Sequence, residues 1–159
     1  MVKVGDKIPS ATLKTMGESG IQDITTEELT TGKKVVIFAV PGAFTPTCSK
    51  SHAPGFIQHA AELKAKGVDT IACVSVNDPF VMDAWAKDLA AGSALLFLAD
   101  GNGDFTKAMD LELDGRGFGL GARSQRYAAV IEDGVITKLE VEGGGGLTCS
   151  AADNILKLL

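Results

Sequence analysis

The sequence has little of what secreted, membrane-spanning or nucleic-acid-binding chains need. Its three cysteines are odd in number and far apart, unlike the dense, even sets of disulfide-stapled secreted domains. The longest apolar runs, 35–40 and 94–99, hold six residues each, too few for a membrane span, and the N-terminus has no apolar signal core. Acidic residues outnumber basic ones by 20 to 15, so the net charge of −5 disfavours nucleic acid and anionic membranes as partners. We therefore expect a soluble, cytoplasmic protein.

Internal repeats and charge blocks are also missing from the sequence. The only low-complexity stretch, 143–146, is four glycines and is too short to separate two domains. A chain of 159 residues buries enough surface to fold without a disulfide or metal staple, which leaves the cysteines available for chemistry. We expect residues 1–159 to form a single domain.

Apolar runs bounded by turn residues predict five strands, at 35–40, 70–76, 95–99, 127–131 and 135–141. The first three are apolar at nearly every position, which is typical of strands covered on both faces. The last alternates with polar residues and indicates a wetter edge. Asp133-Gly134 predicts a hairpin between the last two strands, so at least this pair is antiparallel.

Three helical segments lie among these strands. The inward residues that we expect for the first, which ends at a Gly67 cap, are Phe56, Ala60 and Leu63. The second helix is capped by Asn77 or Asp78 and has Pro79 in its first turn. Its expected inward residues are Phe80, Ala84 and Trp85. Those of the third, which starts at a capping box of Ser150 and Asp153, are Ile155, Leu158 and Leu159. The order of elements predicts an α/β fold, a three-layer sandwich with a mixed central sheet flanked by helices.

The segment from Pro41 to Cys48 is the one most suggestive of chemistry. It follows a buried strand, and Thr45 and Pro46 suit the start of a helix, which places Cys48 in the first turn. The unpaired amides of that turn stabilise a thiolate, and a hydroxyl at Thr45 can bond to a polar substrate at the sulfur. The structural alternative is that Cys48 is a small buried hydrophobe, but the Thr-x-x-Cys spacing favours a reactive thiol.

A cation is also needed beside such a thiolate. Lowering the pKa of a thiol from about 8.5 to about 6 requires roughly 3.4 kcal/mol, whereas a helix terminus supplies ~2 kcal/mol at best. No arginine is near Cys48 in sequence, so the candidates are Arg116, Arg123 and Arg126. Arg126 comes just before a predicted strand and is expected to be held most firmly.

Other patterns favour different chemistry more weakly. Cys48 and His52 share a helical face, which allows a Cys–His hydrolase or acyltransferase, although Pro54 is expected to interrupt the helix just beyond them. The stretch 100–104 begins like a calcium loop but lacks the required later glycine and glutamate. The glycines between 115 and 121 do not run from a strand into a helix, so we expect a flexible loop beside the active site and no dinucleotide.

The segment PGAFTPTCSKSHAPGF resembles the active-site signature of the peroxiredoxins, Pro-x-x-x-Thr/Ser-x-x-Cys, and in detail the subfamily of mammalian type five and plant type II enzymes. Further stretches resemble that subfamily in the same order, namely KVGDKIP, ELKAKGV, CVSVNDPFVM, LADGNGDFTKAMDLELD, ARSQRYA and GLTCSAADNIL. The resemblance implies a thioredoxin-like fold and thiol-dependent reduction of hydrogen peroxide and organic hydroperoxides, with no metal, haem or flavin cofactor. It also suggests a homodimer.

Carried over by position, the resemblance makes Cys48 the peroxidatic cysteine, which becomes a sulfenic acid. It implies that Thr45 and Arg126 bind the peroxide and activate the thiolate, and that Pro41 shields the pocket from water.

The thiol that resolves the sulfenic acid has three candidates. GLTCS, with Cys149, resembles the resolving stretch of mammalian type five enzymes, whereas plant type II enzymes use a cysteine placed like Cys73. Cys73 lies in a predicted buried strand, while Cys149 follows the glycine stretch at an exposed helix entry, so we favour Cys149. A third route is direct reduction of Cys48 by glutaredoxin or glutathione, and thioredoxin is the other candidate reductant.

Overall fold

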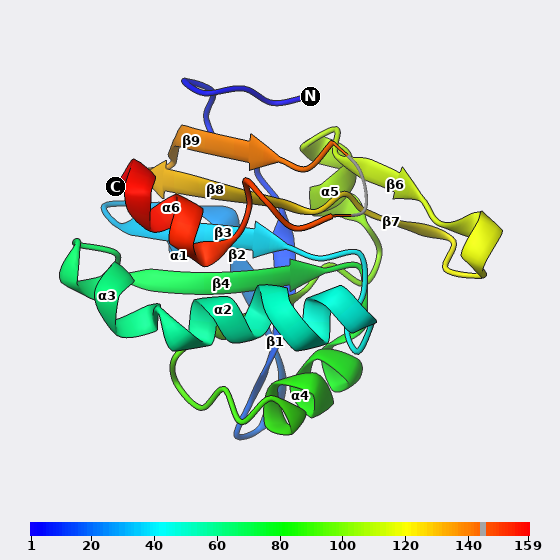
Figure 1. Ribbon diagram of the computed structural model, residues 1–159. Helices are drawn as coiled ribbons and strands as arrows, with labels where there is room; N and C mark the ends of the chain where they lie inside the picture. The colour runs from blue at the N-terminus through cyan, green and yellow to red at the C-terminus, as the bar shows by residue number, and fades with distance from the viewer. Residues whose placement is uncertain (144–145) are drawn as a thin grey trace.

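The computed structural model describes residues 1–143 and 146–159. Gly144 and Gly145, half of the glycine stretch noted above, lie outside the described residues. The main strands are β1 (Thr12–Gly17), β2 (Gly20–Thr25), β3 (Lys34–Ala39), β4 (Thr70–Ser75), β5 (Leu96–Ala99), β8 (Tyr127–Glu132) and β9 (Val135–Val141). They form one sheet in the order β2-β1-β5-β4-β3-β8-β9 (Figure 1). All five predicted strands are therefore present, with ends that shift by one residue at most.

The central sheet is mixed, as predicted. Strands β3, β4 and β5 run parallel, and β8 is antiparallel to both β3 and β9. Between β8 and β9, Asp133 and Gly134 have φ of 50° and 79°. Two successive positive φ values are what a tight two-residue hairpin requires, which is the physical reason for the Asp-Gly pair.

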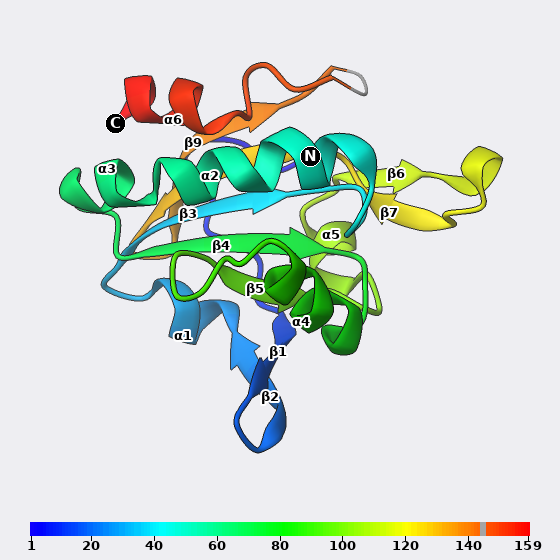
Figure 2. The same cartoon turned by 60° about the horizontal axis from the view of Figure 1, so that its bottom comes forward.

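The pleat of the sheet divides the core into two clusters. Val36 and Phe38 in β3 face one side, and Val35 and Ile37 face the other, because successive side chains of a strand point to opposite faces. The helices on the first face are α2 (Ala53–Gln58), α3 (Ala60–Ala65), α4 (Pro79–Asp88) and α6 (Ala152–Leu158); those on the second are α1 (Thr26–Thr30) and α5 (Asp104–Ala108). Figures 1 and 2 show the resulting three layers.

Helix α3 ends at the predicted glycine. Gly67 has a φ of 91°, its amide donates to Lys64 O at 3.0 Å, and the Val68 amide donates to Leu63 O at 3.3 Å. These two bonds form a Schellman motif, which needs a residue in the left-handed region. The helix before it is divided into α2 and α3 at His59.

Helix α4 begins as predicted but buries a different face. The Asp78 carboxylate accepts the Val81 amide at 2.8 Å and caps the helix before Pro79. Met82 and Trp85 are buried, whereas Phe80 is 63% exposed and Ala84 is also exposed. The predicted stripe is therefore right for Trp85 and wrong for Phe80 and Ala84, because the face of α4 that packs on the sheet contains Met82 together with Trp85.

Helix α6 also starts differently from the prediction. Its N-cap is Ala151, and the Ser150 hydroxyl donates to the Glu142 carboxylate at 2.6 Å instead of capping the helix. Ile155 is buried as expected, while the two leucines at the end of the chain are half-buried.

The sequence patterns missed two hairpins. One is β1–β2 at the edge of the sheet, and the other pairs β6 (Glu112–Asp114) with β7 (Ala122–Ser124). The glycine-rich stretch expected to be a flexible loop is the turn of this second hairpin and contains a 3-10 turn, Arg116–Phe118. The Gly115 amide donates to Gly121 O at 2.7 Å across its base. The β6–β7 hairpin projects away from the main sheet (Figure 1).

Candidate active site

Cys48 lies in the first turn of a helix, as predicted. The Ser49 amide donates to Thr45 O at 2.9 Å, so the amides that precede Ser49 lie ahead of the first intrahelical bond. Residues Cys48–His52 form a π-helical turn, η1, in which the Ala53 amide donates to Cys48 O. Pro54 explains this widened turn, since proline supplies no amide and its ring crowds the carbonyl four residues back. The helix thus continues through Pro54 into α2, contrary to the expected interruption.

The Arg126 guanidinium contacts the Cys48 sulfur from far along the chain. Nη2 donates to Sγ at 3.1 Å, and both residues are buried, with 6% of Arg126 and none of Cys48 exposed. Sheet topology explains the meeting, because Tyr127 at the start of β8 pairs with Ala39 at the end of β3. The residue before β8 and the loop after β3 therefore lie at the same edge of the sheet.

The positive charge of Arg126 is directed to the sulfur. Among the described residues no carboxylate lies within ion-pair distance of this guanidinium, and its Nε is buried without a hydrogen-bond partner. A buried charge interacts strongly with its few neighbours, because little water screens it. The arrangement therefore favours negative charge on Cys48.

The other two candidate arginines have different positions. Arg116 is exposed and pairs with Asp114 at 2.8 Å. Arg123 donates from Nη1 to Pro41 O at 3.2 Å, and a Cβ at Gly42 would come within 2.7 Å of that nitrogen. Arg123 thus fastens the β6–β7 hairpin to the loop before Cys48, and Gly42 leaves room for it.

His52 binds Arg126 and does not serve as a base for Cys48. Its Nδ1 accepts from Arg126 Nη1 at 2.8 Å, and since arginine only donates, Nε2 carries the proton and donates to Ser150 O at 3.1 Å. Burial and the adjacent guanidinium lower the pKa of His52 to about 3, so the ring is neutral at pH 7. The alternative hypothesis of a Cys–His hydrolase or acyltransferase therefore loses its support. The i, i+4 spacing predicted that His52 shares a helical face with Cys48. It did not predict the hydrogen bond between His52 and Arg126.

Thr45 and Pro41 belong to the same loop as Cys48. Thr45 is half-buried, and its hydroxyl donates to Gly42 O at 2.7 Å; the predicted capping bond to the helix is not among the hydrogen bonds of the described residues. Pro41 is half-buried as well. Phe44, between them, has a φ of 64°, in the left-handed region that costs a bulky residue free energy. Such strain is held only where the surroundings fix the backbone.

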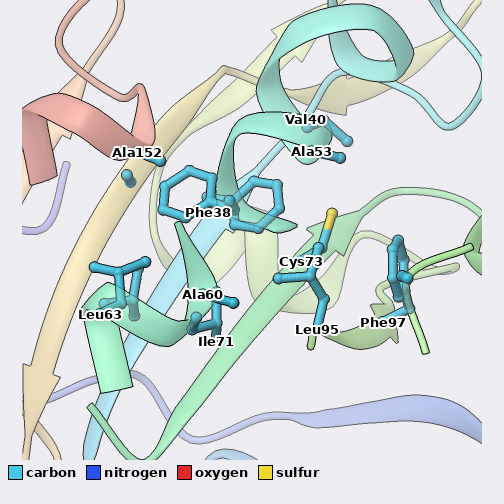
Figure 3. Close-up of a cluster of buried hydrophobic side chains, with 14 of the residues drawn as sticks. Phe38, Val40, Ala53, Ala60, Leu63, Ile71, Cys73, Leu95, Phe97 and Ala152 are labelled. Carbon is cyan, nitrogen blue, oxygen red and sulfur yellow. The ribbon is translucent and has the colours of Figure 1, made fainter. Parts of the chain in front are cut away.

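The remaining thiols differ in exposure. Cys73 is fully buried in β4 between Phe38 and Phe97 of the neighbouring strands, and Figure 3 shows it inside the apolar cluster. Burial, with a further contribution from Cys48, raises the pKa of Cys73 well above its usual value. Cys149 is half-exposed, and its thiol donates to Val141 O at 3.4 Å. Burial followed by the nearby Glu142 raises the pKa of Cys149.

The described residues contain neither a cluster of metal ligands nor a helix that could span a membrane. Within 1–143 and 146–159, no three His, Cys, Asp or Glu side chains gather in a way that could hold a metal ion. Asp100, the first residue of the calcium-like stretch, is buried and accepts bonds from Phe105 N and Thr106 N at the start of α5. Every helix in the described part of the chain is too short or too polar to cross a bilayer.

A mixed sheet with flanking helices, a buried cysteine at a helix start and a guanidinium on its sulfur together are the arrangement expected of a thiol-dependent redox enzyme. The Redoxin family model matches residues 3–156. The chain is 51% identical to Peroxiredoxin-2E, chloroplastic, of Arabidopsis thaliana over 162 residues, covering 99% of this chain and 69% of that protein. It is 50% identical to Peroxiredoxin-2B of the same plant over 159 residues, covering 99% and 98%.

Solved structures agree with these relatives. Reduced Prx3 from Vibrio vulnificus in complex with hydrogen peroxide is 52% identical and superposes with a TM-score of 0.96, over 99% of each chain. The chain therefore belongs to the redoxin family, in its type II peroxiredoxin branch, and is a thiol-dependent peroxidase that acts on peroxides.

Proposed function

We propose that Cys48 is the peroxidatic cysteine, and that it reduces hydrogen peroxide and organic hydroperoxides. The observation that carries this proposal is the 3.1 Å bond from Arg126 Nη2 to Cys48 Sγ, made by a buried guanidinium with no carboxylate at ion-pair distance among the described residues. Cys73 and Cys149 have no comparable cation in that part of the chain.

The reaction requires donors where charge develops. The Cys48 thiolate attacks one peroxide oxygen, the O–O bond breaks, and the other oxygen leaves and takes a proton to become water or an alcohol. The sulfur is oxidised to a sulfenic acid. Negative charge moves from sulfur to the leaving oxygen, so the Arg126 guanidinium, the Thr45 hydroxyl and the Cys48 amide would stabilise the transition state by preorganised hydrogen bonds.

Enclosure of the sulfur supports a shielding role for Pro41. Cys48 has no exposed surface, and Arg123 holds the Pro41 carbonyl in place. A pocket that excludes water strengthens each electrostatic interaction inside it. Pro41 would therefore keep water from the thiolate until a peroxide displaces the pocket wall.

The experiment is peroxide consumption with dithiothreitol as the reductant. Wild-type protein is expected to turn over, and Cys48→Ser to have no activity above background. Cys73→Ser is the matched control, because it changes a buried thiol in the neighbouring strand and is expected to retain peroxide reduction. Turnover by the Cys48→Ser protein would contradict the assignment.

For the resolving step we propose Cys149. Its thiol would attack the Cys48 sulfenic acid, forming the S–S bond and releasing water. Its half-exposed position supports this role, and the full burial of Cys73 disfavours attack by the alternative thiol. Bridged cysteines need Cα atoms within about 7 Å, so the first turn around Cys48 must loosen.

Mass spectrometry without reductant, after one equivalent of peroxide, tests the resolving cysteine. The expected product is a Cys48–Cys149 peptide pair. A Cys48–Cys73 pair would assign resolution to Cys73, and the absence of any internal disulfide would assign it to an external thiol such as glutathione.

The reductant, assembly and location are part of the same proposal. Thioredoxin, or glutaredoxin with glutathione, would reduce the oxidised enzyme. A homodimer is supported by three exposed phenylalanines, Phe44, Phe80 and Phe118. Three free thiols suit a reducing compartment such as the cytoplasm, although one relative carries the word chloroplastic in its name.

A further inference from the structure

The carboxylate of Glu142 gathers the loop that carries Cys149. Glu142 directly follows β9 and is 7% exposed. Its Oε2 accepts from Thr148 N at 2.9 Å, from Ser150 N at 2.8 Å and from Ser150 Oγ at 2.6 Å, and its Oε1 accepts from Thr148 Oγ1 at 2.7 Å. We call this arrangement the Glu142 clamp. It fixes the residues on both sides of Cys149.

Hydrogen bonds, and not a neighbouring cation, stabilise the negative charge of the Glu142 carboxylate. Among the described residues Glu142 has no lysine, arginine or histidine at ion-pair distance. Burial acts to raise the pKa of Glu142, but the bonds from Ser150 and Thr148 outweigh it and lower the pKa to about 2. A buried carboxylate is costly unless its oxygens are satisfied, so the clamp forms as a unit or opens as a unit.

The clamp is connected to the Cys48 sulfur by an unbroken series of hydrogen bonds. The carbonyl of Ser150 accepts from His52 Nε2 at 3.1 Å, His52 Nδ1 accepts from Arg126 Nη1 at 2.8 Å, and Arg126 Nη2 reaches Cys48 Sγ at 3.1 Å. The Glu142 amide also donates to Arg126 O at 3.0 Å. Glu142 therefore touches Arg126 through the backbone and is linked to its guanidinium through Ser150 and His52.

We propose that Glu142 is a positioning residue for peroxide reduction, which aims the Arg126 guanidinium at Cys48 by holding the Ser150 carbonyl against His52. This inference rests on the proposed role of Cys48. The ring of His52 has one orientation in which it accepts from the arginine and donates to Ser150. If Ser150 is released, the ring and the guanidinium lose that orientation, and small misplacements of catalytic groups slow reactions severely.

The clamp also links the two thiols of the proposed cycle. Glu142 holds Thr148 and Ser150, the two chain neighbours of Cys149, so an approach of Cys149 to Cys48 that displaces residues 148–150 would break the clamp. The same carboxylate thus favours the attack on peroxide and restrains the later approach of Cys149.

The experiment compares Glu142→Ala with Glu142→Gln. Glutamine keeps one carbonyl oxygen for the amides and places a nitrogen near Thr148 Oγ1, so it preserves most of the clamp. We expect Glu142→Ala to slow the reaction of Cys48 with hydrogen peroxide at least about tenfold, the loss of roughly one hydrogen bond to a charged group. Alkylation of Cys48 by iodoacetamide should move to higher pH, and Glu142→Gln should stay within about threefold of wild type.

A double-mutant cycle with His52→Leu separates positioning from general loosening. If Glu142 acts through His52, the Glu142→Ala change adds little in the His52→Leu protein. Glu132→Ala is the matched control, since it removes an exposed carboxylate at the far end of β8 and is expected to change neither the rate nor the alkylation profile.

Three outcomes would overturn the inference. These are a Glu142→Ala protein with the wild-type rate and alkylation profile, one that loses the same factor with and without His52, and a Glu132→Ala protein that is slowed as strongly. If Glu142→Ala does not fold, the same cycle is run with Glu142→Asp, whose shorter side chain cannot reach all four donors of the clamp, and a loss of the same factor with and without His52 contradicts the proposal. Failure of the proposed function is distinguishable, because the Cys48→Ser protein would then still consume peroxide.

Discussion

Arg126 carries a full positive charge in the protein interior, and its guanidinium donates a hydrogen bond to the Cys48 sulfur. Arginines in protein interiors are usually paired with carboxylates, which neutralise their field. Here the neighbours of the guanidinium are Cys48 and the neutral His52. Since no carboxylate lies at ion-pair distance among the described residues, the field of the guanidinium acts on the Cys48 sulfur and on the charge that develops there during a reaction.

The first prediction concerns this guanidinium. Arg126→Met keeps an unbranched, flexible side chain but removes the guanidinium and its charge, and should slow peroxide reduction by roughly 10- to 100-fold, since a hydrogen bond to a charged group contributes about 1.5–3 kcal/mol. The pH profile of Cys48 alkylation should move upward. Stopped-flow kinetics measure the rate of peroxide reduction, and alkylation at a series of pH values measures the profile. Arg116→Met, which changes an exposed arginine, is the control for both measurements. An unchanged alkylation profile would refute the role of Arg126.

The second prediction concerns acid stability. His52 has an ordinary pKa of 6.5 when unfolded and a folded pKa of about 3, so the unfolded chain binds the proton first as pH falls. Stability from the neutral ring is complete above pH 6.5 and decreases toward pH 3, by at most about 1.4 kcal/mol per pH unit. Urea unfolding between pH 7 and 4 should show this slope, and His52→Leu should flatten it. A wild-type curve that is flat over this range would contradict the burial of a neutral ring.

At the scale of elements, hydrogen-bonded caps fix where helices start. Asp78 caps α4, and Met82 and Trp85 of this helix pack against the sheet. Trp85 Nε1 in turn donates to Ser49 Oγ at 2.9 Å, which ties α4 to the turn after Cys48. A capping residue on the surface thus contributes to the placement of the active-site helix.

The third prediction tests that cap. Asp78→Ala should lower the free energy of unfolding by about 1 kcal/mol, within the usual range of 0.5–2 kcal/mol for loss of an N-cap. Asp88→Ala, at the other end of α4, is the matched control and should be neutral or slightly stabilising, because an acid near a helix C-terminus is unfavourable. Denaturant titrations of both variants decide the matter. An equal decrease in the free energy of unfolding for Asp78→Ala and Asp88→Ala would contradict a stabilising role for the Asp78 cap.

The sequence predicted elements best where an apolar run or a cap gave a strong signal. The strands at 35–40 and 70–76 were predicted for that reason, and so was the start of α4, where the structure selects Asp78 from the two candidate caps Asn77 and Asp78. The hairpin β1–β2 was missed because the edge strand β2 has no buried residue and β1 has one, Leu13. The sequence does contain a signal for α1, because Thr25 and Glu28 have the spacing of a capping box and form one in the structure.

At the scale of the whole molecule, the site depends on contacts that local patterns do not contain. The resemblance pointed to Arg126, but only the pairing of β8 with β3 brings it to Cys48. The connection through His52 to Ser150 and Glu142 joins residues nearly one hundred positions apart, and no periodicity predicts such a bond.

The fourth prediction concerns assembly. Phe80 is 63% exposed on α4, Phe44 is 50% exposed in the loop before Cys48, and Phe118 is 88% exposed in the β6–β7 hairpin. We expect these three side chains to contribute to one apolar surface, and contiguous exposed apolar surfaces commonly mark interfaces. Sedimentation should therefore show a dimer, and Phe80→Glu should shift it toward monomer, while Phe56→Leu, a buried change, should leave assembly intact. A monomeric wild-type protein would contradict this prediction.

The complete enclosure of Cys48 also bears on which oxidants the enzyme can use. An opening made by the shift of a few side chains admits narrow molecules more often than wide ones, so the pocket would act as a sieve. Among oxidants of similar intrinsic reactivity, the rate of reaction with Cys48 should then decrease as the molecule becomes wider, so hydrogen peroxide should react faster than branched hydroperoxides. A variant with smaller side chains in the pocket wall should reduce these differences in rate.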